Sequence, residues 1–222
     1  MARTVKIFAA SLLSFLLPAA SALALTSPLS EQLVREAYFL GQRRDGTYAR
    51  LLGKYMKVLP RPKTGPYISS VTFSTPFLQM VAYADGYVGN YSAQQAQIDY
   101  RNKGEEVVRV SVEIQLTDSY GQLVAVPANS GSNSSTGFVP RPHDFWKDFE
   151  VRIHNGDREL TPADSRGHAN SRCGRRGPCV LIGAALEFDF PARVFTSDSA
   201  TIDVLPPQGD VVSVDFDLSS LR

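Results

Sequence analysis

An alternation of apolar and polar residues within positions 106–116, strict from Val108 to Leu116, constrains the fold more than any other feature of this chain. The apolar residues are Val108, Val110, Val112, Ile114 and Leu116, and the polar residues between them are Arg109, Ser111, Glu113 and Gln115. Successive side chains of a strand point to opposite faces, so this pattern describes a strand with one buried and one solvated face. Such strands are typical of antiparallel sheets.

Further segments that we interpret as strands follow one another through most of the chain. They lie at 71–75, 77–84, 122–126, 149–153, 157–160, 180–190, 201–205 and 211–218. Residues 77–84 are apolar on both faces and are interpreted as a central strand. The Asn155-Gly156 pair favours a type I′ hairpin turn. Residues 127–142 are rich in Ser, Asn, Gly and Pro and are expected to form a long mobile loop.

This succession of eight or nine strands with hairpin-length connections predicts a mostly β protein, because parallel strands would need crossover helices. We expect an antiparallel β-sandwich, with the immunoglobulin-like arrangement as the best description. Its inter-sheet disulfide is missing, since Cys173 and Cys179 are only six positions apart.

Helical periodicity precedes the β region. Ser27 and Pro28 have the residue types of an N-cap and a first helical position, and apolar residues then recur at helical spacing until Gly41. A second helix is expected over 48–59, ending before Pro60. A third short helix, capped by Ser92, is predicted over 92–103.

The expected organisation has four parts. They are a signal peptide at 1–24, a helical segment at 25–59 that packs on the sheets, a proline-rich connector at 60–66 and a β-sandwich domain at 67–222.

The first 24 residues resemble a secretory signal. Arg3 and Lys6 precede an apolar core, and Ala22-Leu23-Ala24 fits a signal-peptidase site. We therefore expect a secreted or periplasmic protein with no transmembrane segment after cleavage, the alternative being an uncleaved anchor. An oxidising compartment favours a Cys173–Cys179 disulfide over a redox or metal site, and argues against cytosolic cofactors.

The net charge of the chain says little about its binding partners. The chain has 23 Lys and Arg against 22 Asp and Glu, and cleavage would lower its net charge from +1 to −1. A nearly neutral protein has no electrostatic reason to bind nucleic acid. No cofactor or metal ion is expected.

Positive charge does gather around the cysteines, in a segment, 166–179, that we interpret as a loop. Its basic or titratable residues are Arg166, His168, Arg172, Arg175 and Arg176. Arginines held on a disulfide-closed loop are suited to bind an anionic group. The alternative is a solvated loop whose charges serve solubility.

A second group of charges is expected on the outward face of the C-terminal strands. It consists of Glu187, Asp189, Asp203, Asp215 and Asp217. These carboxylates lack the spacing of a calcium loop, and outward-facing arginines accompany them, so we interpret them as a solvated sheet face.

The sequence lacks the common catalytic signatures, including the Gly-x-Ser-x-Gly elbow and the His-Glu-x-x-His helix. We therefore expect a non-catalytic binding or structural protein that acts outside the cytoplasm on an anionic ligand or another extracytoplasmic protein. The alternative is a polysaccharide hydrolase with a groove near His143, Asp144 and Trp146, beside the 127–142 loop.

Overall fold

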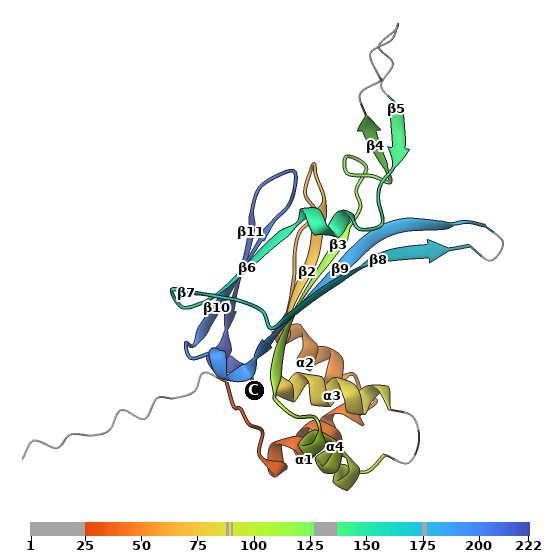
Figure 1. Cartoon of the computed structure of the whole chain (residues 1–222). Coiled ribbons are helices and arrows are strands. Elements are labelled where there is room, and N and C mark those ends of the chain that lie inside the picture. The colour runs from red at the N-terminus through yellow and green to blue at the C-terminus, as the bar shows by residue number, and fades with distance from the viewer. Residues whose placement is uncertain (1–24, 88, 90, 127–136, 175–176) are drawn as a thin grey trace, which may run out of the picture.

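The computed structural model describes residues 25–87, 89, 91–126, 137–174 and 177–222, and shows a mostly β protein with antiparallel sheets (Figure 1). A five-stranded sheet has the order β1-β2-β3-β9-β8, a four-stranded sheet has the order β11-β10-β6-β7, and β4 pairs with β5. The strands are β1 (Met56–Val58), β2 (Tyr67–Ser74), β3 (Val107–Gln115), β4 (Leu123–Val126), β5 (Gly137–Pro140), β6 (Glu150–Asn155), β7 (Arg158–Leu160), β8 (Asp164–Cys173), β9 (Cys179–Pro191), β10 (Ser199–Leu205) and β11 (Val212–Asp217).

The two larger sheets contribute to one hydrophobic core. The predicted apolar face of β3 is confirmed, because Val108, Val110 and Val112 are fully buried. From β2, the Phe73 ring lies 5.5 Å from the Phe216 ring of β11, which belongs to the other sheet. The burial of these apolar faces leaves the opposite face of the five-stranded sheet to polar residues.

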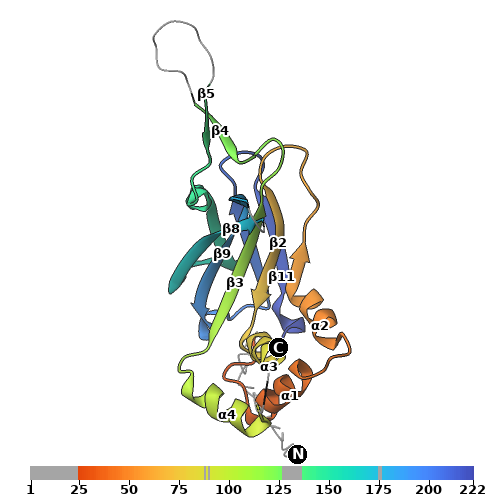
Figure 2. The same ribbon diagram turned by 90° about the vertical axis from the view of Figure 1, so that its right-hand side faces the viewer.

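Four helices gather at one end of the sheets (Figures 1 and 2). They are α1 (Glu31–Gly41), α2 (Thr47–Tyr55), α3 (Pro76–Gly86) and α4 (Ala93–Asn102). α1, α3 and α4 share a second hydrophobic cluster that includes Val34, Phe77 and Ala96. This cluster joins helices from the 25–59 segment to helices from the 67–222 segment, and the division of the chain into domains stays a prediction.

The first helix begins later than its sequence predicts. Ser30, not Ser27, is the N-cap, and its side chain accepts a hydrogen bond from the Leu33 amide. Ser27 instead donates to the Glu106 carboxylate, which anchors the chain just before α1. None of the helices among the described residues is long and apolar enough to cross a bilayer.

The second helix is shorter than predicted. α2 ends at Tyr55, and residues 56–58 form β1, which pairs with β2 in the register Met56↔Thr72. The apolar spacing that predicts a helix to 59 continues through this strand. Tertiary pairing with the edge of the sheet outweighs the local pattern there.

The predicted strand at 77–84 is wrong, because these residues form α3. Thr75 caps the helix by accepting from the Leu78 amide, and Pro76 occupies its first turn. α3 is buried on most sides, which hides its helical periodicity. At its contact with α1, a β-carbon on Gly41 would lie 2.3 Å from the Val81 carbonyl oxygen, so the two backbones touch directly. The predicted helix at 92–103 is confirmed as α4, with Ser92 as its cap.

The predicted hairpin at Asn155-Gly156 forms one residue later than expected. Asn155 pairs with Arg158 as the last residue of β6, and Gly156, with φ of 59°, begins the turn. Residues 137–140 of the predicted 127–142 loop form β5, whereas 127–136 lie outside the described residues.

The predicted loop at 166–179 is also wrong, because most of it is strand. β8 pairs with β9 from Asp164↔Asp189 to Cys173↔Cys179, which makes a long hairpin. β8 carries polar residues on both faces, so its sequence lacks the apolar–polar alternation that indicates a strand. It is an edge strand, and only one of its sides pairs within the sheet.

Candidate functional site

The solvent-facing side of the five-stranded sheet carries an ordered array of polar side chains, which we call the polar face. The strand register places its residues in four rows across β2, β3, β9 and β8. The rows are Ser74-Arg109-Asp189-Asp164, Thr72-Ser111-Glu187-Arg166, Ser70-Glu113-Ala185-His168 and Tyr67-Gln115-Gly183-Asn170. Two rows are rich in charge, and the other two have the smallest side chains at their centre.

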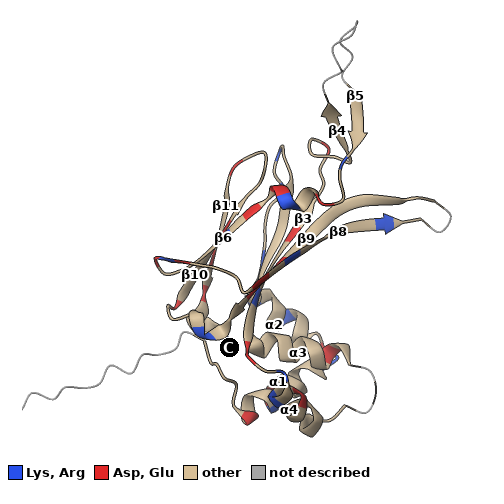
Figure 3. Cartoon of the chain, viewed as in Figure 1, with Lys and Arg blue, Asp and Glu red and all other residues tan. Residues whose placement is uncertain are grey.

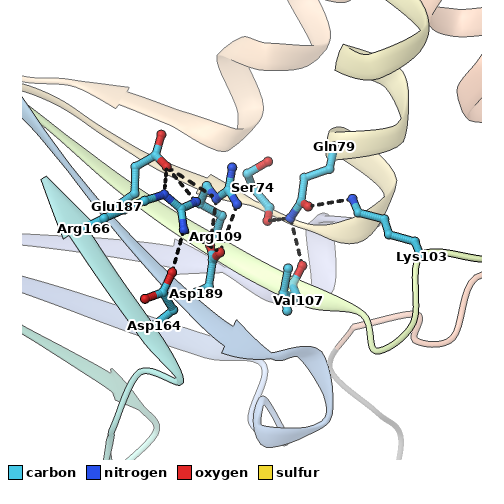
Figure 4. A network of polar contacts seen from close by, with 9 residues as sticks. All are labelled: Ser74, Gln79, Lys103, Val107, Arg109, Asp164, Arg166, Glu187 and Asp189. Atoms are coloured by element: carbon cyan, nitrogen blue, oxygen red, sulfur yellow. Dashed lines mark hydrogen bonds and ion pairs between the residues drawn. The ribbon is translucent and has the colours of Figure 1, made fainter. Parts of the chain in front are cut away.

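The first two rows form an ion-pair network (Figure 4). Arg109 binds Asp189 through two nitrogens, at 2.7 and 2.9 Å. This bidentate hydrogen bond holds the pKa of Asp189 below its ordinary value. Arg166 contacts Glu187 at 2.8 Å, Asp164 at 2.8 Å and Asp189 at 3.2 Å. Three carboxylates thus surround two guanidinium groups, which leaves Arg166 poorly suited to attract an anion.

Helix α3 is tied to the same end of the polar face. The Gln79 amide donates to the Ser74 carbonyl at 3.0 Å and to the Val107 carbonyl at 2.8 Å, and it accepts from Lys103 at 3.4 Å (Figure 4). Burial lowers the pKa of Lys103, with a smaller contribution from the nearby charge of Arg109. The network is therefore fixed to the helices as well as to the strands.

A cavity of about 240 Å³ lies over the last row. Its lining includes Glu113 and Gln115 of β3, Asn170 and Arg172 of β8, and Gly183 of β9. A β-carbon on Gly183 would lie 2.1 Å from the carbonyl oxygen of Ile114, so no other residue fits there without moving the backbone. The pairing of β8 with β9 shifts by one residue beside it, from Asn170↔Gly183 to Ser171↔Leu181.

The cavity has opposite charges on its lining. Asn170 donates to the Glu113 carboxylate at 3.3 Å. Burial raises the pKa of Glu113, although the charge of His168 and the Asn170 hydrogen bond oppose this. Arg172 is exposed and forms no ion pair with any other described residue. Glu113 and Arg172 thus both line the cavity, and they form no ion pair with each other.

The structure divides the basic residues that the sequence grouped together. Arg166 belongs to the ion-pair network, His168 lies in the third row of the polar face, and Arg172 lines the cavity. Arg175 and Arg176 lie outside the described residues. The contribution of Glu113 and Gln115 was missed, because their proximity to Arg172 depends on the pairing of β3 with β9. The sequence feature that could have indicated them is their position among the polar residues of the 106–116 alternation.

Cys173 and Cys179 are joined by a disulfide at the far end of the β8–β9 hairpin, with Cα atoms 4.0 Å apart. β3 ends at Gln115, opposite Gly183. Beyond that pair, Leu116 donates to the Ile182 carbonyl and Gln122 to the Leu181 carbonyl, so among the described residues only 179–180 have β8 alone beside them.

The residues of the alternative hydrolase site lie in and next to a short 3-10 helix, Phe145–Asp148. Asp144 forms an exposed ion pair with Lys147 at 3.2 Å, and the Trp146 ring packs against Gly167 of β8. His143 is exposed. The five cavities characterised in the described part of the chain include none of the three side chains, and the hydrolase alternative stays a prediction.

The predicted group of outward carboxylates is divided between the sheets. Glu187 and Asp189 belong to the ion-pair network, whereas Asp203 and Asp215 lie on the four-stranded sheet, where they accept from Ser213 and Thr201. Among the described residues, no group of three or more His, Cys, Asp or Glu side chains is placed to hold a metal ion.

The largest of these five cavities, of about 930 Å³, lies where the β4–β5 hairpin leaves the sheet. Arg141 stacks on the Tyr120 ring at 3.6 Å there and donates to the Gly121 carbonyl at 2.7 Å. β4 and β5 carry no charged residue (Figure 3), and Phe138 is 66% exposed. This cavity is open to solvent, and its lining mixes apolar residues such as Leu123 and Phe138 with polar ones such as Asp118 and Gln122.

Comparison with known proteins assigns neither cavity a role, since no protein-family model and no curated protein matches the chain.

Proposed function

We propose that this is an exported, non-catalytic binding protein that takes an anionic ligand at the outer half of the β8–β9 hairpin. One observation carries the proposal. Of the two basic residues from the predicted arginine group that are described on β8, Arg166 is surrounded by three carboxylates, whereas Arg172 has no described acidic partner and lines a cavity. A guanidinium group without a carboxylate is available for a bidentate contact with an anion.

The extracytoplasmic setting belongs to the same proposal. It is supported by the signal-like first 24 residues and by the Cys173–Cys179 disulfide, which oxidising compartments maintain. We further propose that the two larger sheets form a β-sandwich of immunoglobulin-like arrangement. Their shared hydrophobic core supports this description.

The test is a binding screen of the exported protein against sulfated, phosphorylated and carboxylated ligands at two ionic strengths. Binding is expected to weaken as salt rises, because exposed charges are screened. A variant combining Arg172→Gln, Arg175→Gln and Arg176→Gln should lose binding and keep its melting curve.

The matched control combines Arg35→Gln, Arg43→Gln and Arg50→Gln, three exposed arginines of the helical segment. It removes the same charge far from the hairpin and should bind as the parent does. Full affinity in the hairpin variant, or binding that ignores salt, would contradict the proposal.

A further inference from the structure

We infer that the cavity over Gly183 binds a small carboxylate that carries a hydroxyl or ammonium group close to its carboxyl group. This inference rests on the proposed function and assigns the ligand class to one cavity. The ligand carboxylate would contact Arg172, and its donor group would contact Glu113.

The cavity is a built feature of the sheet. Gln115, Gly183 and Asn170 lie side by side in one row, and Gly183 contributes no side chain to it. The neighbouring row has Ala185 at its centre, again a small residue, between Glu113 and His168. The close approach of Gly183 to the Ile114 carbonyl forbids a larger residue at the floor of the cavity.

The size of the cavity limits the ligand. A volume of about 240 Å³ corresponds to about eight water molecules at about 30 Å³ each. A ligand, or the part of it that enters, therefore has roughly that number of non-hydrogen atoms. This fits one amino acid or small hydroxy acid, or the carboxylate end of a sugar acid, and is too small for a folded partner.

The charges of Arg172 and Glu113 determine which ligand groups the cavity can accept. A lone anion would be attracted by Arg172 but repelled by the Glu113 carboxylate, and a lone cation would meet the reverse. A ligand with a carboxylate at one end and a donor at the other satisfies both groups. The amides of Gln115 and Asn170 supply further donors and acceptors along the lining.

Glu113 also distinguishes the two ligand classes that carry such a donor group, amino acids and sugar acids. An ammonium group would form a charge-assisted hydrogen bond with the carboxylate, whereas a hydroxyl group would form a weaker one. Replacing Glu113 by Gln preserves an acceptor of similar shape and removes the charge. Amino acids should therefore be far more sensitive to Glu113→Gln than sugar acids.

The experiment is an NMR titration of the exported protein with D-glucuronate and, separately, with L-alanine. Saturable shifts are expected at the amides of Gln115, Asn170 and Gly183 with at least one of the two ligands. Methyl glucoside and L-alaninamide, which lack the carboxylate, should give none. Arg172→Gln should weaken binding about tenfold, the loss expected for one charge-assisted contact.

Glu113→Gln identifies the source: about a tenfold loss for L-alanine indicates an amino acid, and a loss of about twofold or less for D-glucuronate indicates a hydroxy acid. Arg152→Gln, which removes an exposed arginine from the four-stranded sheet, is the matched control and should change nothing.

The outcomes separate the two proposals. If neither carboxylate shifts these amides, or if Arg172→Gln binds them as the parent does, the inference is wrong. The proposed function then still holds provided that the hairpin variant loses an anionic ligand found in the screen. If the screen finds no salt-dependent ligand and neither carboxylate binds, both proposals fail.

Discussion

Asn155 offers the sharpest test of how the β6–β7 hairpin is held. Its side chain is 4% exposed and forms four hydrogen bonds with the backbone of 196–199. The amide nitrogen donates to the carbonyls of Ser197 and Ser199, at 2.9 and 2.8 Å. The amide oxygen accepts from the amides of Thr196 and Ser197, at 2.8 and 2.9 Å.

Replacement by Ala removes all four bonds and leaves their backbone partners without them. At about 1 kcal/mol for each bond, with some replaced by water, Asn155→Ala should lower the free energy of unfolding by about 3 kcal/mol. With a urea dependence of about 2 kcal/mol per molar, the midpoint of urea unfolding should fall by about 1.5 M. Circular dichroism in urea measures this directly.

Asn155→Asp keeps the two acceptor bonds but places a carboxylate against the carbonyls of Ser197 and Ser199. Burial raises the pKa of such a carboxyl group, so its folded form holds a proton more tightly than its unfolded form. Stability should therefore be nearest to the parent at about pH 4 and fall as pH rises. A loss below about 1 kcal/mol for Asn155→Ala, or a deficit for Asn155→Asp that does not grow with pH, would refute this reasoning.

Three further predictions concern the polar face and the hairpin. Because burial raises the pKa of Glu113, its charged form costs stability, so Glu113→Gln should raise the melting temperature at pH 7 and lose this advantage below its ordinary pKa of 4.5; an equal gain at both pH values would contradict the assignment. In Gly167→Ala, the new β-carbon would lie 2.5 Å from the Trp146 ring, so the ring should be displaced and the emission of this single tryptophan should shift to longer wavelength. Cys173 and Cys179 should resist alkylation in denaturant without reductant, and replacing both by Ser should cost about 2 kcal/mol because the closed loop is short; two reactive thiols would rule out the bridge.

The strands of the core could be predicted because their burial is one-sided. Val108, Val110 and Val112 face the core while Arg109 and Ser111 face water, and this contrast is visible in the order of the residues. Helix α3 could not be recognised by the same contrast, because it is buried on most of its surface. Thr75 and Pro76 were the available signal, as a capping residue followed by a proline in the first turn is typical of a helix start.

The candidate site was only partly predictable. Arg172 stands out in the sequence as a basic residue near the cysteines, but nothing local indicates that Arg166 is already engaged by Glu187 and Asp189. The proximity of Glu113 and Arg172 also depends on long-range pairing. It follows from the order β3-β9-β8 and from the register shift beside Gly183, neither of which apolar spacing encodes.

The disulfide at the end of the β8–β9 hairpin has a consequence for engineering. A two-stranded ribbon without a third strand is marginally stable in water, and residues 179–180 are in that position. The covalent bond keeps the two strands in register at the point where the sheet no longer does so. The segment between Cys173 and Cys179 is closed into a short loop by this bond. It is the natural place to graft a foreign peptide, since the bond would hold the ends of the insert about 4.0 Å apart at their Cα atoms whatever sequence lies between them.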